Sequence, residues 1–219
     1  MTTLSKKDIL KKIQEQAIRF SPSLDSHQIQ PNSIDLRLGT TFYIPKAWEC
    51  NEKGRCALKI DYLDYQNKQE SFKIVSLKPG QYFEILSNEF IIASTYEKIE
   101  LKAPDIMAVM YARSSIIRRG LIIESGIIDA QYSGYLMIPI VNNTNSQIIR
   151  LYPGERICQL VLHTLSGELT AQDAQKHGSQ SAKYESSTPY GLEARSDSAD
   201  EVELIKAGRL EELKNRFAL

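Results

Sequence analysis

Residues 112–135 bring together side chains that could bind a phosphate group and direct a water molecule. Arg113 carries a planar guanidinium whose donors suit phosphate oxygens, and the hydroxyls of Ser114 and Ser115 add neutral donors beside it. Asp129 follows two β-branched apolar residues, where an unpaired buried carboxylate would cost on the order of several kcal/mol. Such an aspartate is either solvated at the end of a strand or used for chemistry. The segment could therefore form a compact pocket for a nucleoside phosphate.

A simpler interpretation of the same segment is a turn. Residues 129–134 contain turn-forming residue types between two apolar runs, so a hairpin with an exposed Asp129 also accounts for the pattern. From residue chemistry alone, this turn is favoured over a catalytic Asp129.

Five blocks of the sequence resemble, in order, the motifs of the dUTPase and dCTP deaminase superfamily. They are residues 29–39, 112–115, 126–134, 153–160 and 183–188. The first block is similar to the N-terminal signature of the deaminase branch, and the third is similar to the nucleoside-binding hairpin in its dUTPase form. The resemblance spans about residues 5 to 190, and five ordered blocks are much more specific than any single one.

Two departures from the deaminase pattern bear on the choice between the branches. Deaminases of this family carry a glutamate as general base in the strand after the hairpin, and the resemblance puts Pro139 at that position. Proline cannot accept or donate a proton, as general acid–base catalysis requires. The hairpin is also shorter than in typical deaminases. We therefore expect the dUTPase branch, with a dCTP deaminase, also in a bifunctional form, or a non-catalytic nucleotide-sensing regulatory protein as the alternatives.

The resemblance implies a dUTP diphosphatase that hydrolyses dUTP to dUMP and pyrophosphate. Asp129 would be catalytic and would orient the water that attacks the α-phosphorus. The substrate-binding residues would be Arg113, Ser114, Ser115 and Gln159 at the phosphates, the backbone of Gly126, Ile127 and Ile128 at uracil, Tyr132 at the deoxyribose, and Lys183 and Tyr184 in a C-terminal arm. Mg2+ would be carried mainly by the triphosphate, so no metal site made by the protein is expected. The resemblance also implies a homotrimer with sites at subunit junctions.

Asp35 lies in a segment with the rhythm of a strand. Asp35 and Arg37 alternate with apolar residues, which places both on one face, where they could simply pair with each other or across the sheet. The resemblance implies a support role for Asp35 near the metal–triphosphate region. Both interpretations remain open.

The remaining pattern predicts the elements that position these residues. Apolar residues repeat at helical spacing over residues 5–18, with Ser5 as N-cap, and short runs rich in Ile, Val, Tyr and Phe alternate with turns from about residue 30 to 165. An antiparallel sandwich or barrel follows, which the resemblance narrows to a mainly β, distorted jelly roll with an N-terminal helix and a C-terminal helical extension. We expect a β domain over residues 1–165, an arm over 166–196 and a helix over 197–219, with Gly208 as a candidate break.

Composition limits the partners. The 27 basic and 27 acidic residues cancel, so a broad basic surface for polynucleotide is not indicated. Cys50, Cys56 and Cys158 do not form a disulfide framework. The spacing from Cys50 to Cys56 suits a turn better than a zinc site, and a buried thiol is expected at Cys158. No segment approaches membrane-spanning length, and a cytoplasmic protein is expected.

Overall fold

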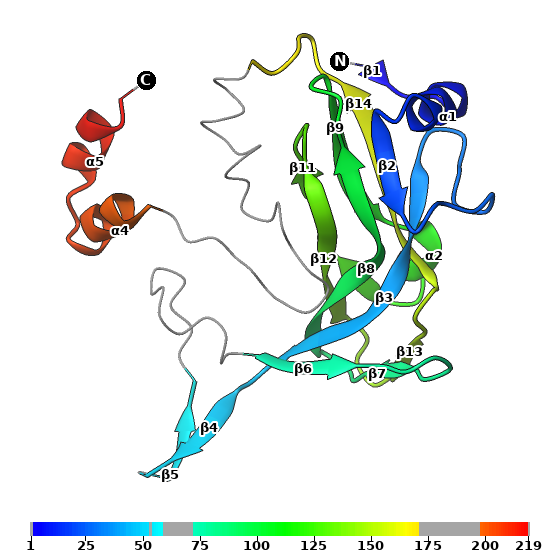
Figure 1. Cartoon of the computed structure of the whole chain (residues 1–219). Coiled ribbons are helices and arrows are strands. Elements are labelled where there is room, and N and C mark those ends of the chain that lie inside the picture. The colour runs from blue at the N-terminus through cyan, green and yellow to red at the C-terminus, as the bar shows by residue number, and fades with distance from the viewer. Residues whose placement is uncertain (1, 53, 59–71, 171–197, 219) are drawn as a thin grey trace. The chain divides into compact units, whose positions relative to one another are not determined.

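The computed structural model of the chain describes residues 2–52, 54–58, 72–170 and 198–218. The helices are α1 (Lys6–Gln14), α2 (Ser114–Ile117), α4 (Ala199–Lys206) and α5 (Leu210–Arg216). The strands are β1 (Thr2–Thr3), β2 (Ile18–Ser21), β3 (Ile34–Pro45), β4 (Trp48–Asn51), β5 (Gly54–Ala57), β6 (Phe72–Ser76), β7 (Phe83–Ile85), β8 (Phe90–Leu101), β9 (Ile106–Ala112), β10 (Leu121–Ile123), β11 (Gly126–Ile128), β12 (Ser133–Asn142), β13 (Ile149–Leu151) and β14 (Arg156–Thr164). The expected fold class, mainly β with helices toward both ends of the chain, is confirmed (Figure 1).

The largest sheet is antiparallel and runs in the order β10-β12-β8-β3-β14-β9-β11, with β1, β2 and β6 pairing at its sides. Its two outermost strands, β10 and β11, are consecutive in the sequence and are joined by Glu124 and Ser125 alone. The three Cα–Cα steps from Ile123 to Gly126 reach about 11 Å at most. The sheet must therefore curl until the ends of its two edge strands meet at this connection.

The N-terminal helix α1 begins as predicted. The Ser5 hydroxyl accepts a hydrogen bond from the Asp8 backbone, and the Asp8 side chain returns one to the Ser5 backbone N–H, which forms a capping box. The helix ends at Gln14, earlier than the apolar pattern suggested, because Gln16 adopts a left-handed φ of 59° and Ile18 already belongs to β2. Tertiary pairing of β2 with β8 thus shortens the helix.

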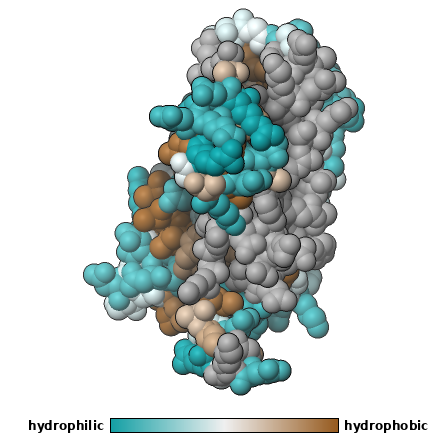
Figure 2. Space-filling model, turned by 90° about the vertical axis from the view of Figure 1, so that its left-hand side faces the viewer, coloured by the Kyte–Doolittle hydropathy of each residue, from teal (hydrophilic) through white to brown (hydrophobic). Residues whose placement is uncertain are grey.

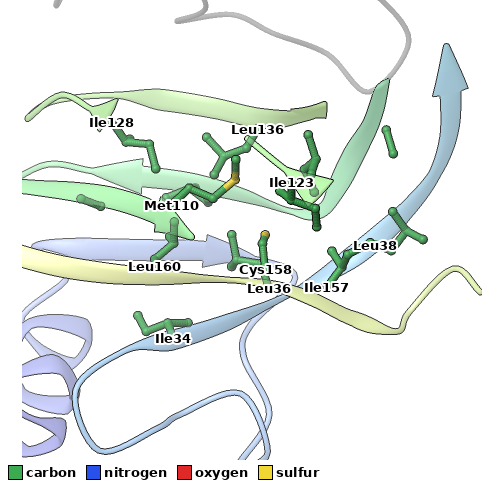
Figure 3. Packing of buried hydrophobic residues seen from close by; sticks show 14 of the residues in the cluster. Ile34, Leu36, Leu38, Met110, Ile123, Ile128, Leu136, Ile157, Cys158 and Leu160 are labelled. Atoms are coloured by element: carbon green, nitrogen blue, oxygen red, sulfur yellow. The ribbon is translucent and has the colours of Figure 1, made fainter. Parts of the chain in front are cut away.

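The core lies between the strands of the curled sheet. In Figure 3, buried side chains from β3, β9, β12 and β14 converge, and Ile34, Leu36, Met110, Leu136 and Leu160 are among them. Each large apolar side chain that is removed from water contributes roughly 1.5–3 kcal/mol. Cys158 is part of this cluster, which confirms the predicted burial of its thiol.

The chain divides into two compact units, which we describe separately. One contains Met1–Pro45 and Phe72–Glu193, and the other contains Lys46–Ser71 and Ala194–Leu219. In the second unit, β4 pairs with β5 across the turn predicted between Cys50 and Cys56. These two cysteines and Cys158 of the first unit are free. Helices α4 and α5 contact each other, and Gly208, with a φ of 70°, separates them at the predicted break.

Apolar side chains also reach the surface of the described residues. Ile127 is 72% exposed, and Ile117 and Ile122 are more than a third exposed. Figure 2 shows one face, on which brown hydrophobic surface lies beside teal hydrophilic surface. Among the described residues, no helix is long and apolar enough to cross a membrane.

Candidate functional site

A buried aspartate holds two arginines at the centre of the site. The Nε atom of Arg113 lies 2.9 Å from Oδ2 of Asp35, and Nη1 of Arg156 lies 3.1 Å from the same oxygen. Arg113 Nη1 also donates to the carbonyl oxygen of Arg156 at 2.9 Å. Because one carboxylate and one carbonyl fix it, the Arg113 guanidinium is positioned before any ligand arrives.

Arg37 does not pair with Asp35, although both lie on the same strand. Its guanidinium instead forms an ion pair of 2.6 Å with Asp25 and donates to the carbonyl oxygen of Gly154 at 2.6 Å. The pairing interpretation of Asp35 offered two kinds of partner: pairing with Arg37 is wrong, and pairing across the sheet is found. The support role that the resemblance implies for Asp35 stays a prediction.

The register of three neighbouring strands explains why these groups meet. In β14, Gln159 lies opposite Asp35 of β3 on one side and Tyr111 of β9 on the other. Residues directly opposite in an antiparallel pair project from the same face. Arg113 follows Tyr111 by two residues, so it continues this row on the same side of the sheet. The alternate positions carry the apolar side chains of the core.

Burial controls the electrostatics of Asp35. The residue is 2% exposed, and removal from water raises the pKa of its carboxyl, while the charges of Arg113 and Arg156 act in the opposite direction. The side chains of Arg113 and Arg156 are 24% and 30% exposed, so their guanidinium groups still reach solvent. The cluster thus combines a buried anchor with cationic groups that an anionic ligand can approach.

A second buried carboxylate supports the first. Glu97 is 1% exposed and accepts hydrogen bonds from the Gln28 amide at 2.7 Å and from the Arg37 backbone N–H at 2.9 Å. The Gln28 amide also donates to the backbone carbonyl of Asp35 at 2.9 Å. Burial raises the pKa of the Glu97 carboxyl, and the hydrogen bond from Arg37, followed by that from Gln28, opposes this rise. Gln28 therefore links the Glu97 carboxylate to the backbone of Asp35.

Sequence reasoning missed three members of this network, namely Arg156, Gln28 and Glu97. Glu97 lies between Tyr96 and Lys98 in a polar part of β8, so the sequence around it gave no signal of burial. Arg156 opens a strand directly after a Pro-Gly turn, where a basic residue is unremarkable. Nothing in the sequence around Gln28 distinguishes it.

The residues predicted to bind phosphate lie on neighbouring elements. Ser114 and Ser115 form the first turn of α2 directly after Arg113 and are exposed, and Gln159 is half-buried in the adjacent strand β14. Three neutral donors and one fixed guanidinium can satisfy the oxygens of a polyphosphate. The phosphate-binding roles of these residues stay predictions.

The predicted nucleoside hairpin is not a pair of neighbouring strands. Strand β11, with Gly126, Ile127 and Ile128, pairs with β9, whereas β12 pairs with β8 and β10. The turn between β11 and β12 therefore connects two different parts of the curled sheet. As an edge strand, β11 leaves backbone donors and acceptors along one side unpaired within the sheet, where a base could bind.

Asp129 and Tyr132 close this turn. The Tyr132 N–H donates to the Asp129 carbonyl at 3.3 Å, and Asp129 is exposed, as the turn interpretation predicted. Tyr132 is 9% exposed, belongs to the core cluster and donates from its hydroxyl to the Tyr135 carbonyl at 2.9 Å. This burial indicates a packing role for the Tyr132 ring within the chain, and its predicted contact with the deoxyribose stays a prediction.

Two predicted site residues, Lys183 and Tyr184, lie outside the described residues. Within the described part of the chain, no group of three or more His, Cys, Asp or Glu side chains is arranged to hold a metal ion.

The fold and the site together define a mainly β protein with a curled antiparallel sheet and a polar site suited to an anionic ligand. Residues 3–165 match the model of the dCTP deaminase-like family. The chain belongs to this family.

Two curated relatives have the same description. The chain is 33% identical over 186 residues to "dCTP deaminase, dUMP-forming" of Methanosphaera stadtmanae, covering 84% of this chain and 89% of the relative. It is 40% identical over 161 residues to the protein of that description from a Sulfurihydrogenibium species, covering 72% and 81%. In fold, the chain resembles the 2'-deoxycytidine 5'-triphosphate deaminase of Agrobacterium tumefaciens, with a TM-score of 0.57 and 23% identity over 80% of this chain and 51% of that one.

These relatives correct the expected branch. The expected dUTP diphosphatase function and the corresponding pyrophosphohydrolase class are contradicted, because these curated relatives are described as dCTP deaminases. The superfamily itself was recognised correctly. The expectation relied on Pro139 and on the length of a supposed hairpin. Strands β11 and β12 do not pair with each other, so residues 126–134 do not form the hairpin whose length was compared.

Proposed function

We propose that this protein binds dCTP and deaminates it, with dUMP as the final nucleotide product. Its similarity to two proteins described as dUMP-forming dCTP deaminases supports the reaction. The structural observation that carries the proposal is the Arg113 guanidinium, held 2.9 Å from Asp35, with Ser114 and Ser115 following it at the start of α2. This arrangement suits the triphosphate that such a substrate carries.

The rest of the site supports positioning of the nucleotide. The triphosphate would lie against Arg113 and the two serines, and the unpaired edge of β11 would hydrogen-bond the base. Holding dCTP in a fixed geometry supplies much of the rate enhancement in such reactions, because the reacting groups no longer need to find each other. Asp35 acts here as a positioning residue, since it reaches the ligand only through Arg113.

Mg2+ would enter this site bound to the triphosphate. The Asp35 carboxylate is already engaged by Arg113 and Arg156, and no cluster of three candidate metal-binding side chains occurs in the described residues. Mg2+ commonly binds through substrate phosphates with few protein ligands. When bound, the ion neutralises part of the phosphate charge, while the chain's own groups hold the phosphate oxygens.

We further propose that the protein assembles as a homotrimer in the cytoplasm. The exposed apolar side chains Ile117, Ile122 and Ile127 support an interface between copies, because such side chains gain from being removed from water. A mass of three times 24.8 kDa in light scattering would support the trimer, and a monomer mass would contradict it.

The direct test incubates the purified protein with Mg2+ and either dCTP or dUTP, and measures ammonia and pyrophosphate separately. Ammonia and dUMP from dCTP support the proposal. Absence of ammonia contradicts it.

One observation favours a second candidate, a nucleotide-sensing protein without deaminase activity. Pro139 occupies the position where the family resemblance puts a proton-transferring glutamate, and proline has no titratable side chain. Binding of dCTP without release of either product would support this candidate.

A further inference from the structure

We propose that Glu124 transfers the proton in the deamination of dCTP; this inference rests on the proposed function. Hydrolytic deamination needs a group that takes a proton from water and delivers one to the departing nitrogen. Pro139 cannot do so, and a titratable group from another element must therefore supply the step.

The sheet brings Glu124 next to Pro139. Strand β10 pairs with β12 so that Ile123 lies opposite Ile140, and the following residue, Glu124, donates its backbone N–H to the Pro139 carbonyl at 3.4 Å. Ile123 and Ile140 are buried and point into the core. By the alternation of a strand, the neighbours Glu124 and Pro139 project together to the other side.

The same residue adjoins the phosphate-binding region. Glu124 and Ser125 form the entire connection between the two edge strands of the curled sheet. Gly126 pairs with Met110, so the connection lies toward the end of β9, from which the chain continues into Arg113. Strand β10 also contacts both β9 and α2, and α2 contains Ser114 and Ser115. A nucleotide whose phosphates lie on Arg113 and whose base lies on β11 would thus have Glu124 beside it.

The Glu124 side chain is accessible to a bound ligand. It is exposed, and no hydrogen bond or ion pair of its side chain is found among the described residues. Asp129, at the opposite end of β11, is the other carboxylate beside this strand, but it is separated from Glu124 by the full length of β11 and does not adjoin Pro139. The carboxylate of Glu124 is consequently the better placed of the two.

The reaction step balances without any further reagent. The Glu124 carboxylate accepts a proton from water as the water oxygen bonds to C4 of cytosine. The proton then passes to the exocyclic nitrogen, the C4–N bond breaks and ammonia leaves. The C4 hydroxyl proton moves to N3 as the C4 carbonyl forms. The carboxylate, which gave its proton to the leaving nitrogen, is thereby regenerated. The sum is dCTP and water giving dUTP and ammonia.

The test compares the wild-type protein with Glu124→Gln, using Glu15→Gln as a control at an exposed glutamate of the N-terminal region. We expect the rate of ammonia release at saturating dCTP to fall about 100-fold or more in Glu124→Gln, with dCTP affinity unchanged, and to stay at the wild-type level in the control. A wild-type rate in Glu124→Gln would overturn the inference and leave the proposed function intact. A lost affinity for dCTP would overturn it as well, because Glu124 would then bind rather than transfer a proton.

A second variant tests the shared face. In the Glu124→Gln background, Pro139→Glu should restore ammonia release at least about tenfold, because both positions project beside the same ligand. Retained dCTP binding without restored release would contradict that geometry. If the wild-type protein itself releases no ammonia from dCTP, both the inference and the proposed function are wrong.

Discussion

Asp35 and Arg113 form a contact of 2.9 Å between the start of β3 and the residue that follows β9. Strand β14 lies between these two strands, so the contact reaches across a neighbouring strand of the sheet. The buried carboxylate therefore does more than neutralise one arginine. It determines where the guanidinium stands relative to Ser114 and Ser115.

Replacing the anchor tests this relationship. Asp35→Asn removes the charge that Arg113 and Arg156 share, and we expect the free energy of unfolding to fall by about 1–3 kcal/mol and triphosphate binding to weaken. Asp25→Asn is the matched control, since Asp25 also pairs with an arginine but its side chain is 44% exposed. Urea denaturation and calorimetric titration with dCTP should show a clear effect at residue 35 and little at residue 25. Equal effects would contradict the role assigned to the buried anchor.

We expect the planar, forked shape of the Arg113 guanidinium to strengthen dCTP binding in addition to its charge. Arg113→Lys keeps the positive charge but cannot contact Asp35, the Arg156 carbonyl and a phosphate at once. We expect the Kd for dCTP to rise about tenfold to 100-fold, as for the loss of a charge-assisted hydrogen bond. Arg19→Lys, at an exposed arginine of β2, should leave the Kd unchanged. A Kd within about twofold of wild type in Arg113→Lys would show that charge alone suffices.

The raised pKa of Glu97 predicts that the free energy of unfolding depends on pH. Because burial raises the pKa of Glu97 above its ordinary value of 4.5, the folded state holds this proton more tightly than the unfolded state. Its contribution to stability is therefore fully present below about pH 4.5 and is lost as the pH rises through the folded-state pKa. Glu97→Gln cannot titrate, so the stability of the wild type relative to the variant should decline from about pH 4 to pH 7.

Urea denaturation of both proteins across this range measures that difference. The raised pKa of Asp35 contributes equally to both proteins and cancels. A difference that grows with pH would contradict the predicted direction.

Gly39 is required by a close approach of two strands. A Cβ atom there would lie 2.7 Å from the Ser94 hydroxyl and 2.8 Å from the Thr95 carbonyl oxygen. Gly39→Ala should therefore lower the free energy of unfolding by about 1–3 kcal/mol, as for other overpacked sites. At Gly167 an added Cβ meets nothing within 4 Å, so Gly167→Ala should be neutral. Chemical denaturation that ranks the two variants in the opposite order would refute this account.

Several features could be predicted because they depend on neighbours in the sequence. The Ser5 cap of α1 and the break at Gly208 follow from residue type and local spacing, and the structure has both. The choice between the branches of the superfamily failed for a related reason. It relied on Pro139 and on treating residues 126–134 as a local hairpin, although the partners of β11 and β12 lie elsewhere in the sheet.

The sequence by itself determined the mainly β class and the adjacency of Arg113, Ser114 and Ser115, because alternation and adjacency are written directly in the order of residues. Only the tertiary structure decided that Asp35 anchors Arg113, that Gln28 reaches Glu97 across 69 positions, and that Glu124 meets Pro139. These contacts depend on strand order and register. A shift of one residue in register would turn the side chains of a strand to the other face, and no local pattern specifies which distant strand becomes the partner.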